Sequence, residues 1–123
     1  MAWTISQSLL QDLMSAAKRV YPYEFISMLS VGEKNAHHVT EFVVLPAEYG
    51  LVHSQLRSDL IPNDPLIVGT VHSHPSRSTR ASNADKNVFA RLGSFHLILG
   101  YPYSLSSFQA YSSFGNPISV KVV

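Results

Sequence analysis

Residues 66–85 read LIVGTVHSHPSRSTRASNAD, and they join the strongest strand pattern of the chain to the start of a helix. The apolar, β-branched run 66–72 predicts a buried strand, which Pro75 ends. Ser82 predicts the beginning of a helix that continues to about Leu92, and Ser82 and Asp85 match the acidic variant of a capping box. A buried strand followed closely by a helix indicates a sheet covered by helices.

The rest of the chain supplies further elements in mixed order. Apolar residues recur every three to four positions over 5–20, which predicts an amphipathic helix with Ser6 as N-cap and a stop at Tyr21-Pro22. Further strands are expected over 25–31, 39–45, 51–56 and 95–99, the third of these being the weakest. Residues 108–111 and 118–122 are expected to form a terminal hairpin. Two helices among about six strands favour an α/β or α+β fold, a mixed β-sheet flanked by helices.

Composition limits the functional classes. The chain has 123 residues with 46% hydrophobic and 14% charged side chains, which suits a single domain over 1–123. A formal net charge of +1 does not favour a nucleic acid or a membrane surface as partner. The first residues are expected to lead straight into the helical pattern and lack the pattern of a signal peptide, so we expect a cytoplasmic protein. The absence of cysteine excludes disulfides, thiolate metal sites and a cysteine nucleophile.

Three side chains of residues 66–85 could hold one metal ion. His72 and His74 are two positions apart on a strand and therefore point the same way, and Asp85 returns on the first turn of the next helix. Two imidazoles, one carboxylate and a water are a typical catalytic zinc site. A histidine pair alone is more often structural, and Ser82 with Asp85 alone is more often a plain helix cap, but their combination favours the metal.

Other polar residues have simpler interpretations. His53 and His96 are expected to be structural, or at most to support the metal ligands. Arg77 and Arg80 lie between the expected ligands and could line a substrate groove, with an ordinary solvated loop as the equal alternative.

The pattern His72-Ser73-His74-Pro75, six residues, Ser82, two residues, Asp85 resembles the signature of the JAMM/MPN+ metalloproteases, the short archaeal members above all. The resemblance implies a single JAMM/MPN+ domain with a cytidine-deaminase-like three-layer sandwich. It implies one Zn²⁺ per chain on His72, His74 and Asp85. It also implies Glu24 as general base and acid, and Ser82 as donor to the oxyanion. Many relatives have Cys-Gly where this chain has Ile26-Ser27, a packing difference.

What the resemblance implies for function is hydrolysis of the bond after the C-terminal Gly-Gly of a ubiquitin-like modifier or sulfur-carrier protein. Conjugates of such proteins are the expected partners, and a homodimer is a possible assembly. The alternatives are a non-catalytic scaffold that binds partner proteins and a zinc amidase acting on small substrates. A nucleoside deaminase is disfavoured because those enzymes use cysteine ligands.

Overall fold

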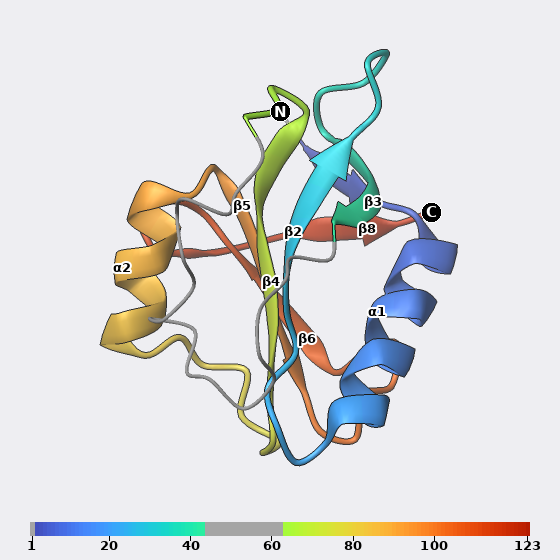
Figure 1. Cartoon of the computed structure of the whole chain (residues 1–123). Coiled ribbons are helices and arrows are strands. Elements are labelled where there is room, and N and C mark those ends of the chain that lie inside the picture. Colours follow the sequence, from blue (N-terminus) through green and yellow to red (C-terminus); the bar gives the residue numbers. More distant parts are fainter. Residues whose placement is uncertain (1, 44–62) are drawn as a thin grey trace.

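The computed structural model describes residues 2–43 and 63–123, and it has an eight-stranded mixed sheet with one helix on each side (Figure 1). In chain order the elements are β1 (Trp3–Ile5), α1 (Gln7–Val20), β2 (Ile26–Val31), β3 (His38–Val43), β4 (Ile67–His74), α2 (Asn83–Arg91), β5 (Phe95–Gly100), β6 (Phe108–Tyr111), β7 (Pro117–Ile118) and β8 (Val120–Val122). The strand order is β7-β6-β5-β4-β2-β3-β1-β8. The predicted three-layer α/β sandwich is confirmed.

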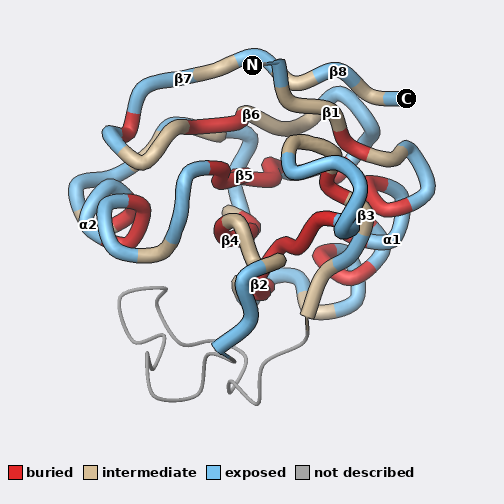
Figure 2. The backbone as a smooth tube through the Cα atoms, turned by 90° about the horizontal axis from the view of Figure 1, so that it is seen from above, coloured by how far each residue is buried: buried red, intermediate tan, exposed pale blue. Residues whose placement is uncertain are grey.

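The sheet curls around α1. Its two outermost strands, β7 and β8, are separated in the chain by Ser119 alone, so the two edges of the sheet come close together. Ile118 and Val120 pack against the same core as the buried face of α1, which includes Leu10 and Leu13. Figure 2, seen from above, shows the buried residues gathered between α1 and the inner strands. Helix α2 covers the opposite face with a smaller cluster around Phe89 and Ile98.

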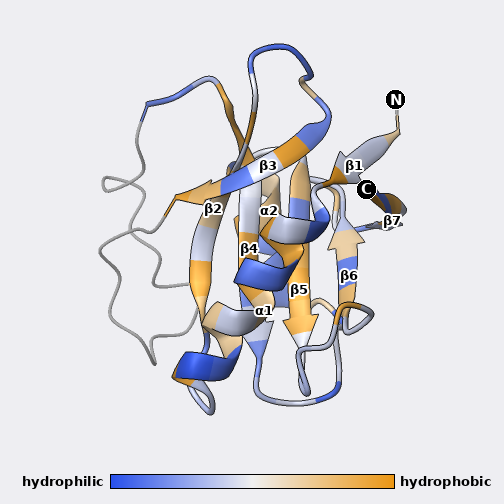
Figure 3. Cartoon of the chain, turned by 90° about the vertical axis from the view of Figure 1, so that its right-hand side faces the viewer, coloured by the Kyte–Doolittle hydropathy of each residue, from blue (hydrophilic) through white to orange (hydrophobic). Residues whose placement is uncertain are grey.

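Both helices begin and end as the sequence predicts. Ser6 caps α1 by accepting a hydrogen bond from the Leu9 N–H at 3.3 Å, and the helix stops before Tyr21-Pro22. Buried apolar residues line one side of α1, and Figure 3 shows polar residues on its outer side with the hydrophobic strand β5 behind it. Neither helix in the described part of the chain is long and apolar enough to span a membrane.

Two expectations about the termini were wrong. The N-terminal residues do not lead straight into a helix, since Trp3–Ile5 form β1 between β3 and β8. The expected strand 118–122 is split at Ser119: Pro117–Ile118 pairs with β6, whereas Val120–Val122 pairs with β1, parallel to it. The reason is the curl of the sheet, which brings the end of the chain to the other edge, where Val120 and Val122 reach the main core.

The centre of the sheet positions the residues singled out above. β4 lies between antiparallel β2 and parallel β5, with His72 opposite Ile26 and His74 opposite Gly100. Gly69 permits the close approach of β4 and β5, because a Cβ there would lie 1.6 Å from the carbonyl oxygen of Phe95. The predicted strand at 51–56 and the end of the one at 39–45 lie outside the described residues.

Candidate metal centre

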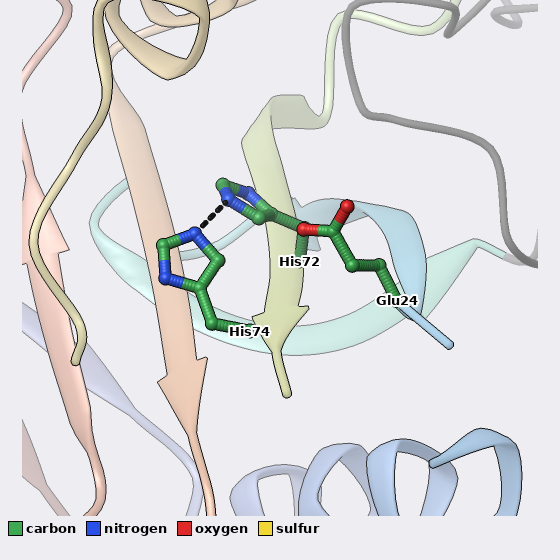
Figure 4. Close-up of side chains that lie close together, drawn as sticks. All are labelled: Glu24, His72 and His74. Atoms are coloured by element: carbon green, nitrogen blue, oxygen red, sulfur yellow. Dashed lines mark hydrogen bonds between the residues drawn. The ribbon is translucent and has the colours of Figure 1, made fainter. Parts of the chain in front are cut away.

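The two histidines of β4 point to the same side of the strand and meet at their outer nitrogens. The Nε2 atoms of His72 and His74 are 3.2 Å apart, and the rings are tilted at 55° (Figure 4). His72 is buried, and His74 is partly exposed at the end of the strand, just before Pro75. The alternation of side chains along β4 therefore delivers two imidazole nitrogens to one point, as the sequence predicted.

Asp85 brings a carboxylate to the same point from the first turn of α2. Its Oδ1 lies 3.1 Å from the Nε2 of His72, and its Oδ2 lies 3.5 Å from the Nε2 of His74. The side chain is fully buried. A position at the N-terminus of a helix favours the charged carboxylate, because the helix dipole is positive there.

A complete capping box fixes the Asp85 carboxylate. Ser82 is the N-cap, its main-chain N–H donates to Asp85 Oδ2 at 2.7 Å, and its Oγ accepts from the Asp85 N–H at 3.0 Å. Since a hydroxyl can accept and donate at once, the Ser82 O–H proton remains available for another acceptor beside the cluster. The predicted double role of Ser82, as helix cap and as donor, is sterically consistent with this geometry.

Glu24 brings a second carboxylate close to the histidines, from the segment just before β2. One carboxylate oxygen of Glu24 and one nitrogen from each histidine lie within 4.8 Å of one another. Figure 4 shows the half-buried Glu24 side chain directed toward the His72 side chain. The structure thus brings together all five residues predicted for the site: Glu24, His72, His74, Ser82 and Asp85.

The inner nitrogen of His74 has its own partner. Its Nδ1 donates to the main-chain carbonyl of Ser78 at 2.9 Å, which leaves the lone pair of Nε2 directed at the cluster. Burial lowers the pKa of His74, but the hydrogen bonds to Asp85 and Ser78 and the charges of Asp85 and Glu24 outweigh burial and raise it. Nearby negative charge therefore favours a cation at this point.

The donor set fits a metal ion. Two ligand atoms on a tetrahedral zinc, each about 2.0–2.1 Å from it, lie about 3.3–3.4 Å apart. The two histidine Nε2 atoms, 3.2 Å apart, are close to that value. Each lies near a different oxygen of Asp85, His72 Nε2 3.1 Å from Oδ1 and His74 Nε2 3.5 Å from Oδ2. Two neutral imidazoles with one carboxylate also leave a site that needs positive charge. The two histidines therefore have the spacing of ligands on one metal ion, with the carboxylates of Asp85 and Glu24 both close to them.

The loop between the ligands is anchored to β5, β6 and the segment between them. The carbonyl of Thr79 accepts from the Tyr111 hydroxyl at 2.6 Å, and that of Ser76 accepts from the Tyr101 N–H at 2.9 Å. Gly100 lets this loop pass closely, since a Cβ there would lie 2.9 Å from Thr79 Cγ2. Both loop arginines, Arg77 and Arg80, are exposed, and the guanidinium of Arg77 lies 5.9 Å from the centre of the Tyr101 ring.

His96 is not part of the cluster, in agreement with the structural interpretation. Its Nε2 donates to the Gly93 carbonyl at 3.0 Å, its Nδ1 accepts from the Thr70 hydroxyl at 2.7 Å, and its ring stacks on Phe89. Burial, with a smaller contribution from His72, lowers the pKa of His96 to about 4. The imidazole is therefore neutral and structural. His53 lies outside the described residues.

Sequence reasoning missed two residues next to the ligands, Ser73 and Tyr103. Ser73, which lies between the two histidines in the sequence, is fully buried. Tyr103 has a backbone φ of 63°, which is uncommon for a residue other than glycine. The one available signal was the repeated Tyr-Pro-Tyr, at 21–23 and 101–103, whose rings gather in space with Tyr21 and Tyr101 at 5.0 Å. This repeat did not reveal what the side chains contact.

Comparisons with known proteins agree with the site. Residues 6–111 match the family of prokaryotic homologues of the JAB domain. A probable metalloprotease of Haloferax volcanii is 31% identical over 119 residues, covering 90% of this chain and 73% of the relative.

Solved structures agree with both fold and family. A structure described as JAMM, a metalloprotease-like zinc site in the proteasome and signalosome, is 33% identical, with a TM-score of 0.78 over 100% of this chain and 99% of the other. A JAB1/MPN domain protein from Archaeoglobus fulgidus is also 33% identical, with a TM-score of 0.78 over 99% and 97%. A Desulfitobacterium hafniense protein, 18% identical with a TM-score of 0.60 over 98% and 92%, shares the fold.

The fold and these likenesses define the class of protein as a metallohydrolase. More particularly, the chain belongs to the JAB-domain family, the JAMM/MPN+ metalloprotease-like proteins.

Proposed function

We propose that this chain is a zinc-dependent isopeptidase or peptidase that hydrolyses the bond after the C-terminal Gly-Gly of a ubiquitin-like modifier or sulfur-carrier protein. The observation that carries the proposal is the convergence of His72, His74 and Asp85 on one point with the Glu24 carboxylate beside it. Conjugates of such modifiers are the proposed substrates and the cytoplasm is the proposed location. The formal net charge of +1 gives no support to a nucleic acid or membrane partner.

Zinc on His72, His74 and Asp85 would polarise the scissile carbonyl and lower the pKa of a nearby water. Glu24 accepts the proton of the water as the water oxygen bonds to the carbonyl carbon. Ser82 donates its hydroxyl proton as a hydrogen bond to the carbonyl oxygen, which gains negative charge. Glu24 then gives the proton to the departing lysine or peptide nitrogen, and the C–N bond breaks. The products are a modifier with a free Gly-Gly carboxylate and an amine.

The test compares the wild type with Glu24→Gln, which keeps the size of the side chain but cannot take up the proton. Both proteins are loaded with zinc and tested on two substrates. One is a modifier whose C-terminal Gly-Gly is joined to a lysine side chain, and the other is a modifier whose Gly-Gly is followed by a peptide. We expect Glu24→Gln to keep zinc and to lose turnover by about 10²-fold or more. Glu33→Gln, on an exposed turn, is the matched control and should keep full activity.

Three results would count against the proposal. Retained turnover in Glu24→Gln would remove the assigned role of Glu24. A zinc-loaded wild type that cleaves neither conjugate would exclude the proposed substrate class, and hydrolysis of small amides by the same sample would then favour the amidase. A wild type that does not bind zinc at all would favour the scaffold.

A further inference from the structure

Two sets of buried hydrogen bonds hold the main chain beside the candidate base and at a candidate ligand. The Phe25 N–H donates to Ser73 Oγ at 2.8 Å, and the Ser73 N–H donates back to the Phe25 carbonyl at 2.9 Å. The Tyr103 hydroxyl donates to the main-chain carbonyl of His74 at 2.8 Å. Burial raises the pKa of the Tyr103 hydroxyl, and the nearby Ser73 side chain lowers it to a smaller extent.

Both hydroxyl groups act on the main chain. The Ser73 hydroxyl accepts from the Phe25 N–H, and the Tyr103 hydroxyl donates to the His74 carbonyl. These two main-chain points lie next to the candidate base and at a candidate ligand.

Ser73 cannot itself bind the ion. Side chains alternate along β4, so the Ser73 side chain faces away from the side that carries His72 and His74. Ser73 and Tyr103 are nevertheless buried, at 0% and 2% exposure. Residues placed this way have no contact with a substrate at the ligands, and their effect must pass through the main chain that they hold.

The main chain that they hold is that of Glu24 and His74. Phe25 follows Glu24 directly, just before β2 begins at Ile26. The two hydrogen bonds between Phe25 and Ser73 therefore fix the main chain from which the Glu24 side chain extends. The Tyr103 hydroxyl fixes the last residue of β4 in the same way. Tyr103 has an unfavourable backbone conformation, with φ at 63°. Residues with such conformations are found preferentially at functional sites, where the surrounding structure offsets their conformational energy.

We propose that Ser73 and Tyr103 are positioning residues that set the Glu24 carboxylate at its working distance from the metal ligands. This inference rests on the proposed function for its catalytic consequence, because it takes Glu24 as the base. Its structural content, that Ser73 controls where Glu24 lies relative to the ion, can be measured without any substrate.

The kinetic test uses Ser73→Ala and Tyr103→Phe, with Ser27→Ala as matched control. Ser27 is also a fully buried serine, but its hydroxyl donates to the Val43 carbonyl on β3. We expect each of the first two variants to lower kcat about 10- to 100-fold with KM changed less than about twofold, since a displacement of about 1 Å costs about that much. Ser27→Ala should keep kcat.

The second readout needs no turnover. Cobalt(II) is bound in place of zinc, its visible absorption reports the ligands, and the pseudocontact shift of the Phe25 amide reports its place relative to the ion. In Ser73→Ala we expect an unchanged cobalt spectrum, a changed Phe25 shift and at least about tenfold faster hydrogen exchange at that amide, which loses its buried acceptor.

The outcomes separate this inference from the proposed function. An altered cobalt spectrum in Ser73→Ala would overturn it, because Ser73 would then support the ligands themselves. An unchanged Phe25 shift, or a wild-type kcat with the shift moved, would also overturn it. If the wild type cleaves no Gly-Gly conjugate, the proposed function is wrong, but the cobalt and exchange measurements still decide whether Ser73 places Glu24.

Discussion

Asp85 and Ser82 hold each other at the first turn of α2, with the Ser82 N–H 2.7 Å from Asp85 Oδ2 and the Asp85 N–H 3.0 Å from Ser82 Oγ. The other carboxylate oxygen, Oδ1, is 3.1 Å from the Nε2 of His72. The start of a helix and the candidate metal centre therefore share one side chain. Any ion bound there also stabilises the first turn of α2, so metal binding and folding are coupled.

The first prediction concerns Asp85→Asn, which preserves the shape of the side chain and removes its charge. We expect about one zinc per wild-type chain and less than about a tenth of that in the variant, because a carboxylate ligand is lost. Added zinc should raise the melting temperature of the wild type and leave that of Asp85→Asn unchanged. Metal analysis after gel filtration and thermal denaturation check both, with Asp12→Asn, an exposed acid on α1, as control. Full zinc in Asp85→Asn would remove Asp85 from the ligand set.

The second prediction concerns Gly100→Ala beside the loop that orients His74. A Cβ at Gly100 would lie 2.9 Å from Thr79 Cγ2 and 3.1 Å from the Arg77 carbonyl, so the loop must move outward. The Ser78 carbonyl that accepts from His74 Nδ1 moves with the loop, and loss of such a supporting contact costs about 10- to 100-fold in metal affinity. Competition with a chelator measures the affinity. Wild-type affinity in a folded Gly100→Ala would show that the loop does not orient His74.

The third prediction tests the packing of β4 on β5. Gly69→Ala would place a Cβ 1.6 Å from the Phe95 carbonyl oxygen, which only separation of the two strands can relieve. We expect a loss of about 3 kcal/mol or more in the free energy of unfolding, at the upper end of overpacking costs. Gly32→Ala is the control, since a Cβ there meets nothing within 4 Å. Urea denaturation of both variants provides the comparison, and equal midpoints would contradict the described strand pairing.

The fourth prediction follows from the buried imidazole of His96. Its pKa is lowered to about 4 in the folded protein from 6.5, so the fold favours the neutral ring. The stabilisation is therefore present above pH 6.5 and is lost as the pH falls through about 4. Between pH 7 and pH 4 the wild type should lose roughly 3 kcal/mol more stability than His96→Gln. Urea denaturation across this pH range, with a chelator present, measures the difference, and parallel curves for the two proteins would refute the buried neutral histidine.

Much of the site could be predicted because its signals are local in sequence. The alternation that directs His72 and His74 to one side and the capping box of Ser82 and Asp85 each depend on residues two or three positions apart. Glu24 could not be predicted in this way, because no pattern in the adjacent sequence marks it as a functional residue. Only the family resemblance indicated its role. Its role and those of the ligands stay predictions until the variants above are measured.

The features that could not be predicted depend on distant contacts. Trp3–Ile5 is too short to show a strand period and exists as β1 because β3 and β8 lie on either side of it. Ser73 is 48 positions from Phe25 and Tyr103 is 29 from His74, so no pattern in the sequence joins them. The split of the last strand at Ser119 likewise follows from the curl of the whole sheet.

The pairing of β1 with β8 has a consequence for how the protein is made. Trp3 leaves the ribosome well before its strand neighbour Val120, which lies near the other end of the described segment. During synthesis β1 has at most β3 beside it, with its other edge open to any strand of a neighbouring nascent chain. The first of the described strands is therefore covered on both edges only after the last of them, β8, has been synthesised.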